Sequence, residues 1–258
     1  MISTLRIGVI ATNTVREAIR NKLLYTLLVF ALALIGAGVL ISTLSYVEGE
    51  RIIQDVGLAA IRVFSVGIAI FVGVGLIHGE VDRRTIYTIL SKPVSRAEFL
   101  LGKYFGLVLT TWLQLAIMAA AFVGVSLLAG APLDLGHLKA IGLIGMELVL
   151  MVAFATLFSA FTTPMLSSLF SLGLYVVGHL SRDLYHLGRQ SDLESVERVA
   201  TILYRVLPDL EAFNVTLEAS HQLPISASAV GWPVLYGTLY ASVLLLAAVA
   251  IFQRRDFR

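Results

Sequence analysis

The chain contains no cysteine and only six prolines among its 258 residues. The absence of cysteine excludes disulfide bonds and thiolate metal sites. Charged residues are scarce at 14%, whereas roughly a quarter of the residues in a soluble domain are charged. Hydrophobic residues reach 58%, and the mean hydropathy is +0.88. These values predict an integral membrane protein.

Several sequence motifs for nucleotide binding and catalysis are also missing. A G-x-x-x-x-G-K-[ST] phosphate-binding loop is absent, because Gly102-Lys103 lacks both the upstream glycine and a following Ser or Thr. Any ATP hydrolysis is therefore expected on another chain. H-E-x-x-H and G-x-S-x-G are absent too, so we predict no catalytic residue and no cofactor in this chain. The net charge of +2 is small and the basic residues lie at membrane borders, so nucleic acid is not an expected partner.

What the chain does have is a series of apolar runs of about 20 residues, the length with which a helix crosses a hydrocarbon core of about 30 Å. Outer-membrane strands would give weak segments of about ten residues, so the runs predict an all-α protein surrounded by lipid. The six predicted spans are residues 23–44, 56–77, 100–129, 140–161, 165–180 and 234–252. We expect them to form a single transmembrane domain over residues 1–258.

The basic residues predict the orientation. Twelve of the nineteen Lys and Arg residues fall on one side of the spans. They are Arg6, Arg16, Arg20, Lys22, Arg83, Arg84, Lys92, Arg96, Lys103, Arg254, Arg255 and Arg258. The positive-inside rule makes this side cytoplasmic, and an even number of spans places both termini there. The opposite loops are rich in Asp and Glu.

Two flanking segments are expected to be amphipathic. In residues 1–22, Ile2, Leu5 and Val9 form an apolar stripe, which favours an entry helix along the inner membrane surface, although a plain basic anchor is the alternative. Residues 181–233 are predicted to be extracytoplasmic. There, Ser191 and Glu194 are predicted to form the capping box of an amphipathic helix that Pro208 ends. Such a helix could cover the mouth of a pathway or shield the tops of the spans.

The segment between the second and third spans, residues 78–99, is here called the elbow. Its sequence predicts a short helix from Glu80 to Leu90, which Pro93 ends. Ser95 and Glu98 then form a capping box, so that a new helix begins and runs into the third span. Because a helix, a break and a second helix are stiff, this cytoplasmic elbow could transmit force from a partner into two spans.

Residues 79–106, GEVDRRTIYTILSKPVSRAEFLLGKYFG, resemble the membrane subunits of ATP-binding-cassette (ABC) exporters of the second type. In that family a short polar helix between spans two and three docks on the ATPase. Weaker similarities are VREAIRNKLLYTLL before the first span and IFQRRDF after the last. The resemblance covers the first hundred or so residues and the C-terminal tip, and the middle of the chain matches only in topology.

The resemblance implies a six-span permease that pairs with a second permease copy and with cytoplasmic ABC ATPase subunits, which hold ATP and Mg. It also implies export across a bacterial or archaeal cytoplasmic membrane. Carried over by position, the ATPase-coupling residues are Glu80, Asp82, Arg83, Arg84, Thr85 and Ile86. Alternatively, the two arginines only satisfy the positive-inside rule.

Ionisable residues inside spans are costly and often functional. Arg62 and Glu147 are predicted at similar depth, about 10–12 Å from the outer ends of their spans at 1.5 Å per residue. We expect them to form an ion pair or to line one outward cavity. Gln114 is predicted to hydrogen-bond a neighbouring helix or to face the dimer seam, with packing as its main role.

His179, Asp183 and His186 follow each other at helical spacing beside the fifth span, and they are the chain's weak candidate for a metal site. Such groups also occur by chance at membrane edges, and we predict no metal. Three rival functions remain, and one of them is an assembly or anchor protein without transport, in which the elbow would tolerate substitution. An ion-coupled secondary transporter would use intramembrane carboxylates such as Glu147, and a membrane-embedded enzyme would need a buried nucleophile and base or a metal pair.

Overall fold

The computed structural model describes residues 4–45, 48–82, 95–191 and 193–254. The described residues form helices and connecting turns, without strands. Six helices are long and apolar enough to cross a membrane. They are α2 (Lys22–Ser42), α3 (Gly49–Asp82), α5 (Arg96–Leu128), α6 (Leu135–Phe161), α7 (Pro164–Arg189) and α10 (Ala227–Arg254). All six overlap the predicted spans, which confirms the all-α membrane fold.

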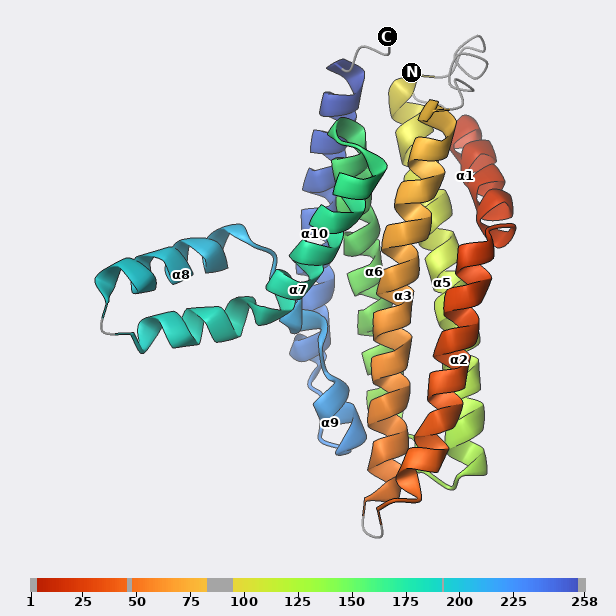
Figure 1. Cartoon of the computed structure of the whole chain (residues 1–258), viewed down its shortest axis with the longest axis vertical. Coiled ribbons are helices and arrows are strands. Elements are labelled where there is room, and N and C mark those ends of the chain that lie inside the picture. The colour runs from red at the N-terminus through yellow and green to blue at the C-terminus, as the bar shows by residue number, and fades with distance from the viewer. Residues whose placement is uncertain (1–3, 46–47, 83–94, 192, 255–258) are drawn as a thin grey trace.

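Helices α3 and α6 form the centre of the bundle. In their most apolar stretches 72% and 67% of residues are buried, against 22% in α2, α7 and α10. Helix α2 packs along α3, and α10 packs along α6. The start of α1 (Thr4–Ile19) and the end of α10 lie at the same end of the bundle, here called the termini end, while the connection from α2 to α3 lies at the far end (Figure 1). This arrangement is compatible with the predicted orientation.

Helix α1 lies within the segment for which an entry helix is predicted. It ends at Ile19, and the Asn21 side chain then accepts a hydrogen bond from the Leu23 N–H and caps α2. The buried residues of α1 are Ala11, Thr14 and Ala18, and the helix packs against α5. Its placement along the inner membrane surface stays a prediction.

One predicted helix start is correct and another is wrong. Ser95 and Glu98 form the predicted capping box, and α5 begins at Arg96. In contrast, α8 (Glu194–Val206) begins after Leu193 and has no side-chain cap. The Ser191 hydroxyl instead accepts a hydrogen bond from the Leu193 N–H in a local turn, a bond that competes with helix capping.

The end of the second span also differs from the prediction. Helix α3 runs without a break through Glu80 to Asp82, so no new helix begins at Glu80. One glycine, Gly79, costs a helix only about 1 kcal/mol, and no proline interrupts the chain before Pro93. Arg83, Arg84 and the rest of the expected short helix, up to Leu90, lie outside the described residues.

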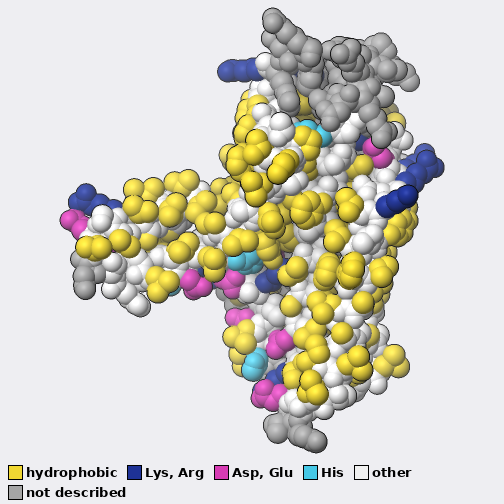
Figure 2. All heavy atoms as spheres, in the orientation of Figure 1, with side chains coloured by type: hydrophobic (Ala, Val, Ile, Leu, Met, Phe, Trp, Pro, Cys, Tyr) yellow, Lys and Arg dark blue, Asp and Glu magenta, His cyan; other side chains and the backbone are white. Residues whose placement is uncertain are grey.

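The fifth span ends in a projecting hairpin. Helix α7 continues past the predicted limit, and its last part and α8 lie side by side and project from the bundle (Figure 1). Stacking of the Tyr185 and Tyr204 rings, with centroids 4.7 Å apart, joins the two helices. Hydrophobic side chains are numerous on the face of this hairpin that Figure 2 shows. Helix α8 thus lies in the segment for which an amphipathic helix is predicted, and the extracytoplasmic location of that segment stays a prediction. The chain then returns through η1 (Glu211–Phe213) and α9 (Thr216–Ser220) to α10.

Candidate functional site

The elbow begins at the end of α3 and ends at the start of α5, and these two ends are here called its roots. The first root, the end of α3, is held to the turn between α6 and α7. His78 is 4% exposed, and its Nε2 lies 2.9 Å from the carbonyl oxygen of Thr162, the residue directly after the last residue of α6. Its Nδ1 lies 3.2 Å from the carbonyl oxygen of Val74, one turn earlier in α3. A movement of the α3 end would therefore reach the α6–α7 turn directly.

The second root is the start of α5, which is held to the end of α10. The Arg96 guanidinium donates from Nη1 to the carbonyl oxygens of Phe252, at 3.4 Å, and Gln253, at 3.0 Å. A cation suits this position because the last carbonyls of a helix lack partners within it and carry its negative dipole end. Phe99 stacks on Phe252 with ring centroids 6.1 Å apart. The start of α5 and the end of α10 are thus joined by polar and apolar contacts.

Ion pairs join the same part of α5 to α1. Lys103 is 1% exposed, and its Nζ lies 3.0 Å from Oε2 of Glu17. Glu98, also 1% exposed, lies 3.8 Å from the Arg6 guanidinium. Removing the partner of a buried charge destabilises a protein more than removing the partner of an exposed charge. The charges therefore fix how α1 lies along α5.

Glycines allow α1 and α5 to approach closely. A Cβ atom at Gly106 would lie 2.6 Å from Cβ of Thr14 and 2.7 Å from the Ala11 carbonyl oxygen. A Cβ atom at Gly102 would lie 2.6 Å from Cβ of Ile10. Close approach through small residues is a common way to pack helices where lipid surrounds them.

We predict that Gly106→Val will displace α1 and lower the free energy of unfolding by about 1–3 kcal/mol, because the new side chain overlaps backbone that cannot move aside. Denaturation of the purified chain in detergent measures this loss. Gly124→Val is the matched control, since nothing lies within 4 Å of a Cβ at that position on the same helix. Equal stability of the two variants would contradict the close contact.

The second polar site lies within the bundle, where the predicted partners Arg62 and Glu147 meet. Nε of Arg62 lies 3.5 Å from Oε2 of Glu147, and the two residues are 8% and 0% exposed. Neither of these two atoms has a hydrogen-bond partner among the described residues, so the contact is an ion pair. Nη2 of Arg62 also donates to the carbonyl oxygen of Phe213, at 3.2 Å. The predicted proximity of the two charges is confirmed, whereas their role in a pathway stays a prediction.

His179 completes this site, in a way that the sequence did not predict. Its Nε2 lies 2.8 Å from Oε1 of Glu147, and its Nδ1 lies 2.8 Å from Oε2 of Glu211. We call Arg62, Glu147, His179 and Glu211 the charge cluster. It joins α3, α6, α7 and η1, which are distant in the sequence.

The weak metal candidate does not come together. Both ring nitrogens of His179 face carboxylates outside the set, and His186 instead contacts the Tyr185 ring. Within the described parts of the chain, no group of three His, Asp or Glu side chains could hold a metal ion. The helical spacing of His179, Asp183 and His186 is therefore a poor guide to their partners.

Glu211 connects the charge cluster to solvent. Burial alone would raise the pKa of its carboxyl group, but hydrogen bonds from His179 and Asn214 outweigh this effect and lower the pKa below its ordinary value. Glu211 is therefore ionised at neutral pH. It also lines a cavity of about 510 Å³ between η1 and α10, here called the α10 cavity.

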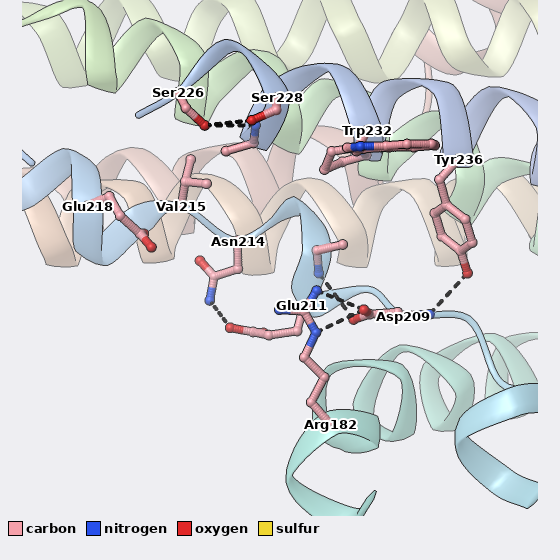
Figure 3. A pocket seen from close by; sticks show the side chains of 13 residues that line it. Arg182, Asp209, Glu211, Asn214, Val215, Glu218, Ser226, Ser228, Trp232 and Tyr236 are labelled. Carbon is pink, nitrogen blue, oxygen red and sulfur yellow. Dashed lines mark hydrogen bonds and ion pairs between the residues drawn. The ribbon is translucent and has the colours of Figure 1, made fainter. Parts of the chain in front are cut away.

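Figure 3 shows the α10 cavity. Trp232 and Tyr236 reach it from α10, and Arg182 reaches it from α7. Acidic side chains reach it from residues 207–226 between α8 and α10, here called the return segment. The Arg182 guanidinium pairs with Asp209 at 2.8 Å, and the Asp209 N–H donates to the Tyr236 hydroxyl, at 3.1 Å. The cavity is thus an opening beside the buried cluster, lined by both charged and apolar side chains.

Gln114 lies apart from both sites. It is 2% exposed, and its amide nitrogen lies 3.3 Å from the sulfur of Met118 in the same helix. Its Oε1 has no hydrogen-bond partner among the described residues. The predicted hydrogen bond to a neighbouring helix is therefore not formed within these residues, and contact with a dimer seam stays a prediction.

Comparison with known families agrees with the fold and with the resemblance noted in the sequence. No curated protein shows significant similarity to the chain. The model of the ABC-2 family transporter proteins matches residues 8–257. Because the match includes all six spans, the chain belongs to the ABC-2 transporter family, as one of its multi-pass membrane components.

Proposed function

We propose that this chain is the permease subunit of an ABC exporter and that separate cytoplasmic ATPase subunits act on it through the elbow. Two permease copies would form the path, and ATP and Mg would be held by the ATPases. The orientation follows from the basic residues at the termini end, and the expected location is a bacterial or archaeal cytoplasmic membrane.

The observation that best supports this proposal is the convergence of contacts on the two roots of the elbow. His78 holds one root to the α6–α7 turn, while Arg96 and Lys103 hold the other root to α10 and α1. A push on residues 83–94 would therefore act on α3 and α5 and, through these contacts, on α1, α10 and the α6–α7 turn. A passive connection between two spans has no need of such anchoring.

A cross-linking experiment tests the contact with the ATPase. The chain has no cysteine, so Arg84→Cys introduces a single reactive thiol in the elbow. In membranes of the native host, a thiol-directed photo-cross-linker at this position should join the chain to a protein that contains a phosphate-binding loop, identified by mass spectrometry.

The matched control is Glu50→Cys, an exposed position at the start of α3 and at the far end of the bundle. It should give no such product. Equal cross-linking at both positions, or none at Arg84→Cys, would contradict ATPase coupling through the elbow.

A further inference from the structure

Glu147, His179 and Glu211 lie in a row that leads from the buried centre of the bundle to the α10 cavity. Glu147 is 0% exposed, whereas the Glu211 side chain is 35% exposed and lines the cavity. The His179 ring lies between them and contacts both carboxylates at 2.8 Å. A buried carboxylate is therefore linked to solvent through one imidazole.

The contacts of this row indicate how many protons the His179 ring carries. A neutral imidazole has one N–H donor and one acceptor nitrogen. If both carboxylates are ionised, the acceptor nitrogen of a neutral His179 would face a second oxygen that also only accepts. An imidazolium, in contrast, donates to both oxygens. Glu211 is ionised at neutral pH, and Arg62 lies against Glu147, so the favourable state has a doubly protonated His179.

Charge balance leads to the same conclusion. The imidazolium and Arg62 together balance Glu147 and Glu211, so the cluster is neutral. With a neutral His179 it would carry one net negative charge in a largely buried place, which is costly.

Of the other groups near the ring, Tyr175 contacts it edge-on, and Asp209 after α8 is already paired with Arg182. The positive charge of Arg62 opposes the extra proton, but the two carboxylates favour it.

We propose that Glu147, His179 and Glu211 form a proton-binding site that exchanges its proton with the α10 cavity. In release, the Nδ1 proton of the imidazolium passes to Oε2 of Glu211 and then to water, which leaves as hydronium. The remaining proton stays on Nε2, hydrogen-bonded to Glu147. Uptake reverses these steps.

Release has a structural consequence. The Nδ1 lone pair of His179 then faces the Glu211 carboxylate, so the contact between α7 and η1 becomes repulsive. The contact of His179 with Glu147 on α6 remains. Proton release thus loosens the return segment from α7 beside the cavity, which in the predicted orientation faces the extracytoplasmic side.

The test is nitrogen NMR of the full-length chain, labelled with ¹⁵N in its histidine rings and placed in lipid nanodiscs. At about pH 8 a histidine with an ordinary pKa near 6.5 is about 97% neutral. The signals that disappear in His179→Gln belong to His179. They should show two protonated ring nitrogens in the wild type, against the single protonated nitrogen of a histidine with an ordinary pKa.

Glu211→Gln should remove one ring proton from His179 at this pH, because the amide no longer provides a charge. The expected change appears in the NMR spectrum and does not depend on any ATPase, so it is independent of the proposed function. A singly protonated His179 in the wild type, or no change in Glu211→Gln, would overturn the proposal. Glu211 is half-buried at the cavity, so this variant is expected to fold even if changes at Glu147 do not allow folding.

Discussion

Glu147→Ala is expected to lower the free energy of unfolding by about 3–5 kcal/mol, because it leaves Arg62 buried without its carboxylate and removes one acceptor from His179. Unfolding of the purified chain in mixed detergent micelles, followed by circular dichroism, measures the loss. Glu50→Ala is the control, since this glutamate is exposed and its loss should cost within about 0.5 kcal/mol.

A double variant separates the ion pair from general packing. The double variant Arg62→Leu with Glu147→Leu removes both charges. Its loss of free energy of unfolding should therefore be smaller than the summed losses of Arg62→Leu alone and Glu147→Leu alone. The difference is the coupling between the two side chains. Additive losses would mean that the 3.5 Å contact contributes nothing and that the cluster is held by its other members.

The second large effect is expected in the elbow. Reversal of Arg83 and Arg84 to Glu should abolish the coupling of ATP hydrolysis to transport, because it places negative charges where the ATPase is proposed to dock. Insertion should be normal, since Arg96, Lys103 and the basic termini still set the orientation. ATPase activity and transport, measured in proteoliposomes containing the whole complex, should no longer change together.

The control for this charge reversal is Arg198→Glu, on the exposed surface of α8, where Arg198 pairs with Glu194 of the same helix. It should leave coupling unchanged. Normal, transport-coupled ATPase activity in the Arg83 and Arg84 variant would contradict the role of the elbow, and the two arginines would then only set topology.

Much of the fold could be predicted from the sequence because it depends on local features. Apolar length predicts the six spans, and the Ser95 and Glu98 pair predicts the start of α5. The capping box predicted at Ser191 failed because its hydroxyl prefers a turn to Leu193. Glu80 was wrongly predicted to start a helix because the position of the next break, and not the first polar residue, decides where a helix ends.

The charge cluster could be predicted only in part. Arg62 and Glu147 lie at similar depth on their spans, so counting residues brings them together. His179 and Glu211 are 32 residues apart, and their contact depends on how far α7 projects before the chain returns. Helical spacing pointed His179 toward Asp183 and His186 instead. Contacts created by a returning loop leave no periodic signal in the sequence.

The most direct test of the central claim is to purify the tagged chain from its native host in mild detergent and to measure ATP hydrolysis in the eluate. We expect a soluble ABC ATPase to copurify with the chain and to hydrolyse ATP in the eluate. A chain that is recovered alone, without ATP hydrolysis, under conditions that preserve known ABC complexes would contradict the claim. It would then favour a self-contained transporter in which Glu147 carries the coupling.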